Sequence, residues 1–499
     1  MIKTSIDERG AGANDDRARV SMRPSLQKIH DASITILRDV GMRFHHGEIL
    51  RLLRDHGIRV EAQTAFFTEN QIMDRLALAP AKFTLHARNP EHSILIGGDR
   101  THYAPGYGAV FVGQGNGQYR QALLEDYVKL AKLIHCSPCF KVNGGILAQP
   151  SDLVQEEVPP LLQYCAAVLS DKCMLATVGG PTATEMVIDL LRILAGGSEA
   201  FIARPQVIVP INTLSPLQVD YNSLEMLLQY ARNGQPTMIS PCVMAGTTGP
   251  VTLAGTIALA NAEALAGIAL TQMIRPGVPV LYGFQSTAAD LRTGGITIGG
   301  PERSLCIAFG ARLARAYGLP SRGGGADNDA IDFSEQSGYE SMMSMLITRL
   351  EKINFVLHSA GMSASFAAVS YEQFIFGLEI LGMVERYKRG IKVTPETLAL
   401  EAIREAGIGG EFLTKAHTLK HLRKEHYVPG IGHRVRIGLP YDEQMLKREI
   451  QLKLQRMLAE HRPPDLPAHA LEQMRSYLAD RAVSTETVDR LLDRSGAVI

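Results

Sequence analysis

Residues 237–285 read TMISPCVMAGTTGPVTLAGTIALANAEALAGIALTQMIRPGVPVLYGFQ. The stretch begins with a short apolar run, Thr237–Val243, and ends with another, Val278–Gln285, and an Ala-rich run with helical spacing, Leu253–Gln272, lies between them. Short runs rich in β-branched and aromatic residues and bounded by Gly or Pro predict strands, whereas the longer run predicts a helix. The stretch therefore predicts a strand, a helix and a second strand in succession.

The same alternation extends along most of the chain. Helical spacing lies between most of the β-rich runs, as at Thr184–Leu194, Ser215–Ala231, Glu302–Tyr317 and Tyr339–Leu350, and the runs begin every 30 to 41 residues. Eight runs are expected as strands: Ala109–Gln114, Cys139–Gly144, Cys173–Val178, Gln206–Asn212, Thr237–Val243, Val278–Gln285, Leu319–Gly323 and Ile353–His358. A doubly wound sheet also alternates strands and helices, but it usually has five or six strands. Eight periods favour an α/β TIM (β/α)8 barrel.

Segments on either side of the barrel predict additional structure. The first twenty residues are polar and charged, which predicts a loose amino terminus without a secretory signal. Amphipathic helices at Leu26–Arg38 and Glu48–His56 and a hairpin of Lys82–His86 with Ser93–Ile96 form an expected cap. We predict four regions: disordered residues 1–20, the cap at 21–105, the barrel at 106–370, and a helical extension at 371–499. Helices are expected in the extension at Ser370–Arg386, Glu396–Ala406 and Tyr441–Glu460, and short helices or an oligomer contact beyond residue 470.

Composition and charge limit the classes of partner. The chain has 499 residues with 45% hydrophobic content, and both Lys plus Arg and Asp plus Glu number 51. Balanced charge gives no overall field for nucleic acid or an acidic membrane surface. Val251–Ile274 is long enough to span a bilayer, but its Asn261, Glu263 and Ala-rich composition favour a helix packed against a sheet. A cytoplasmic protein is the expectation.

The cysteines indicate neither a disulfide framework nor a complete metal site. Six are scattered along the chain. Cys136 and Cys139 form a C-x-x-C without a second pair at zinc spacing, and His417 and His421 stand four residues apart without an evident third ligand. We expect buried thiols, and structural or docking roles for these histidines.

Residues at the strand ends are the candidates for chemistry, because a TIM barrel places its active site there. They are mostly polar or glycine: Gly113, Gln114, Asn143, Gly144, Asn212, Thr213, Cys242, Thr247, Gln285, Ser286, Arg322, Gly323, Gly324, Gly325 and His358. Small residues in Ser240–Gly255 allow a ligand to approach the backbone. The three glycines at 323–325 predict a flexible or close-approach loop, and flavin or phosphate binding there is the weaker alternative. The sequence has no H-E-x-x-H zinc motif, no P-loop and no G-x-S-x-G nucleophile elbow at these positions.

Several longer motifs resemble one family. They are SPCVMAGTTGP at Ser240, INTLSPL at Ile211, the pair Pro301-Glu302, YGLP at Tyr317, QSGYE at Gln336, HSAGM at His358, and GGEFLTKAHTLKHLRKEHYVP from Gly409. From about Ser25 to Leu439 the chain resembles the trimethylamine methyltransferase family, whose members move a methyl group from a methylated amine to a corrinoid protein. The resemblance is to the branch without pyrrolysine, because Ala326–Phe333 reads ADNDAIDF where the trimethylamine enzymes carry that residue.

The resemblance implies a quaternary amine such as glycine betaine as the methyl donor, because its leaving group is already a neutral amine. It implies a corrinoid (cobalamin) cofactor carried by a partner protein rather than bound permanently, and it favours a homo-oligomer. Three alternatives remain open: demethylation of trimethylamine or another methylamine, a noncatalytic betaine-binding barrel, and a zinc enzyme acting on thiols. The last would need a His-x-Cys and distal Cys set that the sequence lacks.

A betaine needs an aromatic cage for its cation and a hydrogen-bond donor for its carboxylate. His358 is the first choice as donor, followed by Arg322 and Gln336, and carboxylates among Asp327, Asp329, Asp332 and Glu335 are candidates for the ammonium. We predict catalytic roles for His358, Gln336 and Glu335. The expected substrate-binding residues are Tyr107, Phe111, Asn143, Asn212, Tyr282, Gln285, Arg322, Tyr339, Phe366 and Tyr371, with Phe284 as a further aromatic candidate.

Overall fold

A computed structural model describes residues 22–434, 442 and 444–493. The expected loose amino terminus, 1–20, residue 21 of the expected cap, and residues 435–441, 443 and 494–499 of the expected extension lie outside these residues, so the predicted helix Tyr441–Glu460 is described only in part. The other positions of the expected cap, barrel and extension fall within them.

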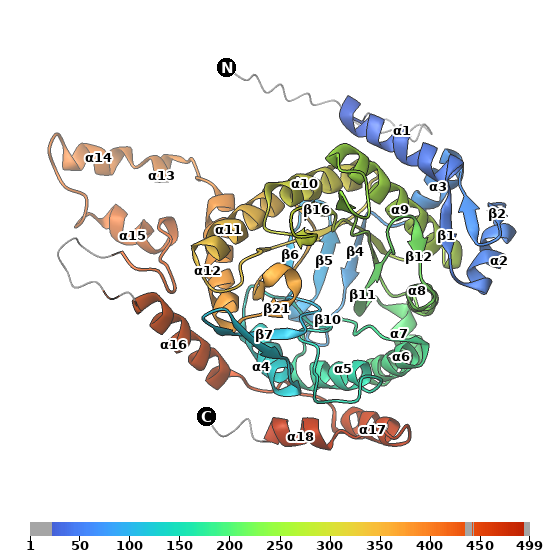
Figure 1. Cartoon of the computed structure of the whole chain (residues 1–499). Coiled ribbons are helices and arrows are strands. Elements are labelled where there is room, and N and C mark those ends of the chain that lie inside the picture. Colours follow the sequence, from blue (N-terminus) through green and yellow to red (C-terminus); the bar gives the residue numbers. More distant parts are fainter. Residues whose placement is uncertain (1–21, 435–441, 443, 494–499) are drawn as a thin grey trace.

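Eight parallel strands form the centre of the molecule (Figure 1). Their order in the sheet is β6, β19, β18, β15, β13, β11, β10, β9, and a parallel bridge between Tyr103 and Phe140 joins the first strand to the last. The ring is therefore a nearly closed (β/α)8 barrel, as the periodicity predicts. The strands are β6 (His102–Tyr103), β9 (Val142–Gly144), β10 (Cys173–Leu175), β11 (Val207–Asn212), β13 (Thr237–Ser240), β15 (Val280–Gly283), β18 (Ser321–Gly324) and β19 (Phe355–Leu357).

Seven of the eight predicted strands are confirmed, and the first is wrong. The barrel begins at β6, whereas Ala109–Gln114 overlaps β7 (Phe111–Gly115), which pairs antiparallel with β8 (Gln118–Gln121) outside the barrel. β6 has only two residues and therefore lacks a run long enough to be recognised. The barrel consequently starts inside the segment assigned to the cap.

Helices surround the barrel (Figure 1). Each parallel strand needs a crossover to the next, and a helix provides it while covering the apolar outer face of the sheet. The surrounding helices are α4 (Leu124–Cys136), α5 (Val158–Leu169), α6 (Pro181–Ala195), α7 (Ser198–Ala203), α8 (Tyr221–Arg232), α9 (Leu253–Ile274), α10 (Pro301–Ala316), α11 (Glu335–Leu350) and α12 (Tyr371–Arg389).

The predicted hairpin closes the amino-terminal end of the barrel. β4 (Lys82–Leu85) and β5 (Ile94–Gly97) pair antiparallel, and one face of the hairpin joins the interior residues of the strands in a single apolar cluster. The thiol of Cys173 donates to the carbonyls of Leu85 and His92, at 3.3 and 3.4 Å. The cluster consists of Phe83, Leu85, Ile94, Ile96, Ala104, Val142, Cys173, Leu175, Ile208, Met238, Leu281, Phe355 and Leu357. The barrel is therefore a packed core that is open to chemistry at the other end only.

Helix α9 is the segment with the length and composition of a membrane span. Among the described residues one helix, Leu253–Ile274, passes that test, and 83% of its most apolar window is buried inside the fold. It packs on β13 and β15 on one side and on α1 (Pro24–Asp39) and α3 (Glu69–Leu76) on the other. Its apolar surface is thus used within the fold, as the sequence interpretation expects.

The cap holds α1, α3 and a small sheet at one side of the barrel (Figure 1). The predicted cap helices are confirmed as α1 and α2 (Gly47–Asp55). The sheet contains β1 (Met42–Phe44), β2 (Arg59–Glu61), β3 (Thr64–Phe66) and β12 (Gln218–Val219), so a loop of the barrel pairs directly with the cap.

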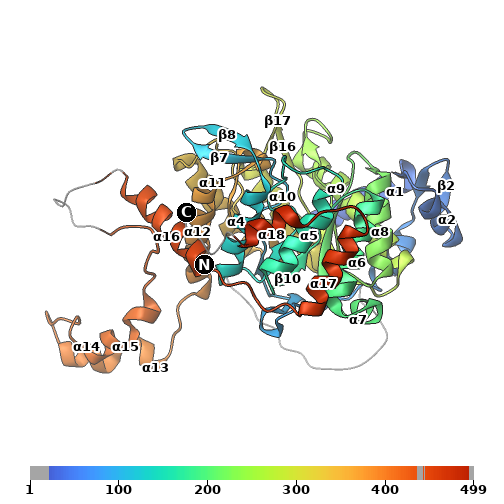
Figure 2. The same ribbon diagram turned by 90° about the horizontal axis from the view of Figure 1, so that it is seen from below.

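The carboxy-terminal extension wraps around the barrel. α16 (Met445–Glu460) packs on α4 and α12, α17 (Ala468–Ala479) on α5 and α6, and α18 (Glu486–Asp493) on α4. Between α12 and α16 the chain forms α13 (Pro395–Leu398), α14 (Leu400–Ala406) and α15 (Ala416–Glu425), which project from the body of the molecule (Figures 1 and 2). The expected helices of this region are therefore present, although α13 and α14 divide the one predicted at Glu396–Ala406.

The hairpin that closes the barrel gives a test of the fold. We expect Leu85→Ala to reduce the free energy of unfolding by about 2–5 kcal/mol, because it leaves a cavity in the barrel interior. Leu95→Ala is the matched control, since Leu95 lies on the other face of the same hairpin and is only partly buried. Urea unfolding followed by circular dichroism measures both, and equal losses would contradict the assigned orientation of the hairpin.

Candidate active site

The mouth of the barrel lies at the carboxyl ends of the strands. Two small sheets stand over this rim: β7 and β8 with β20 (Met362–Ser363) and β21 (Ala368–Val369), and β14 (Met244–Ala245) with β16 (Thr287–Asp290) and β17 (Gly295–Thr297). Figure 2 shows the β7–β8 and β16–β17 hairpins rising on the same side of the barrel. The loops that follow β15, β18 and β19 meet beneath them.

A buried arginine organises these three loops. Arg303, in the first turn of α10, is wholly buried. Its Nε donates to Asp327 Oδ2 at 2.7 Å, its Nη1 to the carbonyl of Gln285 at 2.6 Å, and its Nη2 to the Gln285 side chain. The guanidinium therefore joins the end of β15 to the loop after β18.

Glycine makes room for this ion pair. A Cβ atom on Gly324 would lie 2.1 Å from Asp327 Oδ2 and 2.7 Å from Arg303 Nη2. A Cβ on Gly325 would lie 2.7 Å from the Cα of Ser359, in the neighbouring loop. The glycine run ends β18 and is a close-approach segment rather than a flexible loop, because a larger residue at Gly324 or Gly325 would displace the ion pair or the loop after β19.

A second arginine lies beside the first. Arg322 is on β18 and is 4% exposed, and its Nε and Nη1 have no hydrogen-bond partner among residues 22–434 and 444–493. Burial, together with repulsion from Arg303, lowers the pKa of Arg322 to about 9, while Asp327 opposes that shift. Burial raises the pKa of Asp327, whose Oδ1 is also unpartnered within the described chain. The site thus holds charged groups whose hydrogen-bonding capacity is not fully used.

His358 follows β19 and faces the same loops. Its imidazole is 6% exposed, its ring centroid lies 4.4 Å from that of Phe366, and its Nδ1 has no partner in the described part of the chain. Burial and the nearby charges of Arg322 and Arg303 hold the pKa of His358 well below its usual value. The imidazole is therefore neutral near pH 7, with one ring nitrogen free to contact a ligand.

Backbone strain concentrates at this point. His358 has φ +58°, and Ala364, Ser365 and Phe366 have φ +48°, +53° and +75°. Left-handed conformations in non-glycine residues are costly and cluster at functional sites. Ser365 Oγ donates to Asp329 Oδ1 at 2.7 Å, which helps to hold the turn that carries Phe366 over His358 and Arg303.

Tyr107 lies at another part of the mouth. A Cβ on Gly145 would be 2.6 Å from its ring, so this glycine allows the tyrosine to pack against the loop after β9. Its hydroxyl is buried and unpartnered among the described residues, and burial raises the pKa of the phenol. Tyr107 therefore offers an aromatic face and a free hydroxyl.

A buried carboxylate positions the loop after β11. Glu263 on α9 accepts hydrogen bonds from Thr213 Oγ1, from Ser215 Oγ at 2.8 Å and from the Leu217 amide at 2.8 Å. Burial raises the pKa of Glu263, and these three donors oppose the rise. The loop that begins at Asn212 is thus anchored to the neighbouring helix.

The structure brings part of the predicted site together. Gln285, Arg322, His358 and Phe366 belong to the connected loops after β15, β18 and β19, and Tyr107 and Asn212 lie at strand ends of the same mouth. Phe111 lies on β7 in the hairpin above the rim and is 39% exposed. Arg303 was not expected. Its signal was an arginine two residues after Pro301, in the first turn of a helix that starts at the barrel mouth.

Other expected residues lie elsewhere. Glu335 and Gln336 are exposed at the start of α11, where Gln336 donates to Glu340, and Tyr339 is 65% exposed. The side-chain amide of Asn143 donates to the carbonyl of Ala131 and accepts from the backbone amide of Gly144. The hydroxyl of Tyr371 donates to Asp126 Oδ1 at 2.7 Å, so both side chains already have partners within the fold.

Tyr282 and Phe284 face the helices rather than the barrel interior. Tyr282 donates to Asn261 of α9 at 2.7 Å, and Phe284 packs where a side chain on Gly310 of α10 would stand. Side chains alternate along a strand, and Leu281 already points inward, so Tyr282 must point outward.

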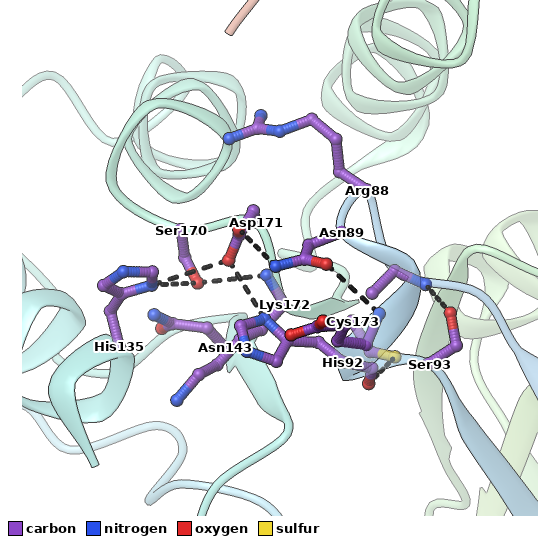
Figure 3. Close-up of polar contacts among 12 residues, drawn as sticks. Arg88, Asn89, His92, Ser93, His135, Asn143, Ser170, Asp171, Lys172 and Cys173 are labelled. Atoms are coloured by element: carbon purple, nitrogen blue, oxygen red, sulfur yellow. Dashed lines mark hydrogen bonds and ion pairs between the residues drawn. The ribbon is translucent and has the colours of Figure 1, made fainter. Parts of the chain in front are cut away.

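A second polar cluster lies at the opposite end of the barrel (Figure 3). Asp171, before β10, lies 3.0 Å from His92 Nδ1 and 3.2 Å from the side-chain amide of Asn89. The ammonium of Lys172 is buried and donates to the carbonyls of Ile134 and Ser137, at 2.7 and 2.8 Å. Most polar groups of this cluster form hydrogen bonds within the fold, so we interpret the cluster as structural.

The sequence motifs for metal or redox chemistry are spread over other regions. Cys136 and Cys139 are free thiols, and burial raises the pKa of each. The ring centroids of His417 and His421 lie 4.4 Å apart on α15, with the rings tilted to one another, next to Glu396. No group of three or more His, Cys, Asp or Glu side chains suited to a metal ion was found in the described ranges.

Comparison with known proteins identifies the family. A model of the family described as trimethylamine methyltransferase (MTTB) matches residues 12–486. The chain belongs to this family. It is 39% identical over 457 residues to the glycine betaine methyltransferase of Desulfitobacterium hafniense strain Y51, covering 91% of this chain and 95% of the relative. It is 30% identical over 473 residues to the proline betaine:corrinoid methyltransferase of Eubacterium limosum, covering 91% and 96%.

A solved structure supports the fold of this family member. The monomethylamine methyltransferase of Methanosarcina barkeri aligns with a TM-score of 0.52 over 87% of each chain, at 11% sequence identity. At that identity the likeness concerns the barrel and its extensions rather than the site.

The histidines at the closed end predict a pH dependence of stability. Burial, with the charge of Lys172, lowers the pKa of His135 to about 4, and the pKa values of His92 and His461 are also lowered by burial. The unfolded chain therefore binds more protons than the fold between about pH 4 and 6.5. We expect the free energy of unfolding to fall as the pH is lowered through this window.

His135→Gln should flatten this dependence, whereas the same change at the exposed His469 of α17 should leave it unaltered. Urea unfolding at a series of pH values measures the slope. A slope that is unchanged in His135→Gln would contradict the assignment.

Proposed function

We propose that this protein transfers a methyl group from a small quaternary amine of the betaine class to the Co(I) corrinoid of a partner protein. The observation that carries the proposal is the pair Arg322 and His358, whose buried nitrogens lack partners within the described chain beside the ring of Phe366. The names of the two betaine-specific relatives point in the same direction.

The carboxylate of a betaine suits these nitrogens. Arg322 has unused donors at Nε and Nη1, which lie on different edges of the guanidinium, and each can donate a charge-assisted hydrogen bond to a carboxylate oxygen. His358 can donate from Nδ1 in the appropriate neutral tautomer. An anion would also offset the burial of the Arg322 charge and its repulsion from Arg303, which together lower the pKa of Arg322 in the free protein. Binding therefore satisfies groups that are costly to leave buried alone.

The ammonium end suits an aromatic surface. Phe366 lies over His358 on a strained turn, and Tyr107 presents a second ring at the mouth. Each contact between a quaternary ammonium and such a ring contributes about 0.5–2 kcal/mol. With the carboxylate at Arg322, the methyl groups would be directed toward the aromatic side and the rim.

The chemistry requires positioning rather than proton transfer. The Co(I) corrinoid supplies an electron pair that forms the new cobalt–carbon bond, while the pair of the broken nitrogen–carbon bond remains on nitrogen, which leaves as a neutral tertiary amine. No proton moves in this balance. The protein therefore contributes by fixing the donor for in-line attack and by excluding water from it.

Trimethylamine fits these residues less well. It has no carboxylate, so Arg322 and the free nitrogen of His358 would stay unpaired in its complex. It is also a tertiary amine, and its unprotonated form would have to lose an amide-like anion as leaving group. The observed donor groups therefore favour a betaine over trimethylamine.

The rim also supports an arriving protein partner. Exposed apolar side chains stand on loops and hairpins around the mouth: Leu214, Val251, Leu291 and Ile331, each 53–65% exposed. Apolar rims of this kind favour protein contacts. We propose that the corrinoid protein docks on them, with its cofactor over the mouth.

The carboxylate contact gives a sharp test. We expect Arg322→Met to lower kcat/KM for glycine betaine by about 10- to 150-fold, because a charged hydrogen-bonded pair of about 1.5–3 kcal/mol is lost. Choline, which carries the same trimethylammonium group without a carboxylate, should show no comparable loss. Formation of methylcobalamin from cob(I)alamin, followed by absorbance, measures both.

Arg292→Met is the matched control, because Arg292 is 88% exposed on the β16–β17 hairpin. A loss of equal size for both donors would place Arg322 outside the carboxylate contact. Saturable betaine binding without methyl transfer, with cobalamin or the cognate corrinoid protein, would instead identify a noncatalytic binding barrel.

The aromatic contact is tested separately. Phe366→Leu keeps most of the apolar volume but removes the ring, and should raise KM for both glycine betaine and choline by about 2- to 30-fold. Phe366→Tyr should restore values near those of the parent protein. If Phe366→Leu matches the parent, the ammonium does not bind at this ring.

A further inference from the structure

A projecting segment at residues 391–428, called the arm here, has a surface that the chain itself does not cover. It leaves the end of α12, runs through α13 and α14, and returns through α15. Figures 1 and 2 show these helices standing away from the body of the barrel. Ala402 is the one residue of the arm that is buried.

The arm continues directly from α12 at its amino end, and polar contacts fix its carboxyl end to the same helix. Arg386 Nη2 donates to the carbonyl of Glu425 at 2.7 Å, and Arg389 Nη2 to that of Lys424 at 2.7 Å. Just beyond the arm's carboxyl end, Glu379 accepts from the hydroxyl of Tyr427 at 2.7 Å and from the amide of Gly430 at 2.8 Å. The arm is therefore a positioned element and not a free tail.

The two limbs of the arm are also joined to each other. Glu396, in α13, accepts from Lys420 at 2.7 Å and lies 3.3 Å from His421, both in α15. These contacts hold α13 and α15 side by side and leave the apolar residues on the outside.

The exposed apolar surface of the arm is extensive. Eleven large apolar residues of the arm are 44% exposed or more: Ile391, Val393, Leu398, Leu400, Ile403, Ile408, Phe412, Leu413, Leu419, Leu422 and Val428. Summed over these residues, the exposed area is on the order of 1,000 Å², comparable to one side of a stable interface. Such a surface requires a partner.

The position of the arm selects between partners. In Figure 2 the β7–β8 and β16–β17 hairpins mark the mouth at one end of the barrel, whereas α13, α14 and α15 extend toward the other end. A protein that delivers a reactant to the mouth would have to cover the rim. The arm could therefore bind a different protein while a reactant carrier is docked at the mouth.

The charges of the arm fit a second copy of itself. Apart from Glu396 and Lys420, which pair within one copy, α14 carries Glu401 and Glu405 against the single cation Arg404, whereas α15 carries Arg423 and Lys424 against Glu425. A two-fold axis that sets the first limb of one copy against α15 of the other would pair opposite charges twice. The whole arm has six Lys or Arg and five Glu, so two identical surfaces would meet without strong net repulsion.

We propose that the arm is a self-association surface that binds the arm of a second copy of this chain about a two-fold axis. The apolar residues form the centre of this interface and the two oppositely charged limbs set its direction. The proposal is independent of the proposed methyl transfer, because it rests on residues remote from the mouth.

The mass of the particle tests this proposal. Sedimentation velocity and light scattering of the full chain at micromolar concentration, without substrate or corrinoid, should give a dimer or a larger even assembly. Ile408→Asp combined with Leu413→Asp should halve that mass, because two charges enter the centre of the interface. Leu78→Asp, at an exposed leucine beyond α3 on the far side of the barrel, should keep it.

Charge reversal tests the two-fold arrangement. Glu401→Lys with Glu405→Lys, or Arg423→Glu with Lys424→Glu, should each weaken dimerisation by about 10- to 100-fold, because like charges then face one another. Combining all four changes should restore most of the affinity. Failure of the combined variant to recover would overturn the antiparallel pairing of the limbs.

Two outcomes would overturn the self-association itself. One is a parent protein that remains a monomer at tens of micromolar, and the other is an Ile408→Asp, Leu413→Asp variant with unchanged mass. If the same variant instead loses binding of the corrinoid protein while its mass is unaltered, the arm belongs to that partner. Methyl transfer to free cobalamin reports the proposed function separately, so the two hypotheses fail independently.

Discussion

The burial of the Arg303 guanidinium constrains the whole mouth of the barrel. A buried charge is costly unless it is paired and hydrogen-bonded, and Asp327 with both oxygens of Gln285 provides these partners for Arg303. Gly324 has no side chain because the ion pair occupies that space. Burial is the main cause that lowers the pKa values of His358 and Arg322, and the charge of Arg303 adds to it, so this residue contributes to both the geometry and the protonation of the site.

The two ends of the barrel differ in how far their buried polar groups are hydrogen-bonded. At the closed end, the hairpin and the carbonyls of the chain satisfy Asp171 and Lys172, and the cluster stabilises the fold. At the mouth, Arg322 and His358 retain nitrogens without partners within the described residues, and four residues nearby adopt left-handed backbone conformations. Unused donors and strain at the functional end of a barrel are consistent with a site that is completed by its ligand.

The arrangement also separates two kinds of association. The rim around the mouth and the arm are both apolar, but they lie toward opposite ends of the barrel (Figure 2). A transient reactant carrier and a permanent second copy would not compete for the same surface. α12 packs on the barrel, and its residues Arg386 and Glu379 also hold the carboxyl end of the arm. In the proposed dimer, the arm would then be held in place on the barrel while its apolar side faces the second copy.

Local patterns were sufficient for the barrel and for the family, because strand and helix periodicity and contiguous motifs are properties of neighbouring residues. Seven strands, the closing hairpin and the buried character of α9 could be read in this way, and so could His358 and Arg322, which stand at strand ends. The two-residue β6 carries too little pattern, so the strand was misplaced. The outward direction of Tyr282, the exposure of Gln336 and Tyr339, and the meeting of Arg303 with Asp327 depend on which elements pack together. Packing of distant segments sets side-chain direction, burial and charge environment, and for that reason these features, like the uncovered surface of the arm, became visible only in three dimensions.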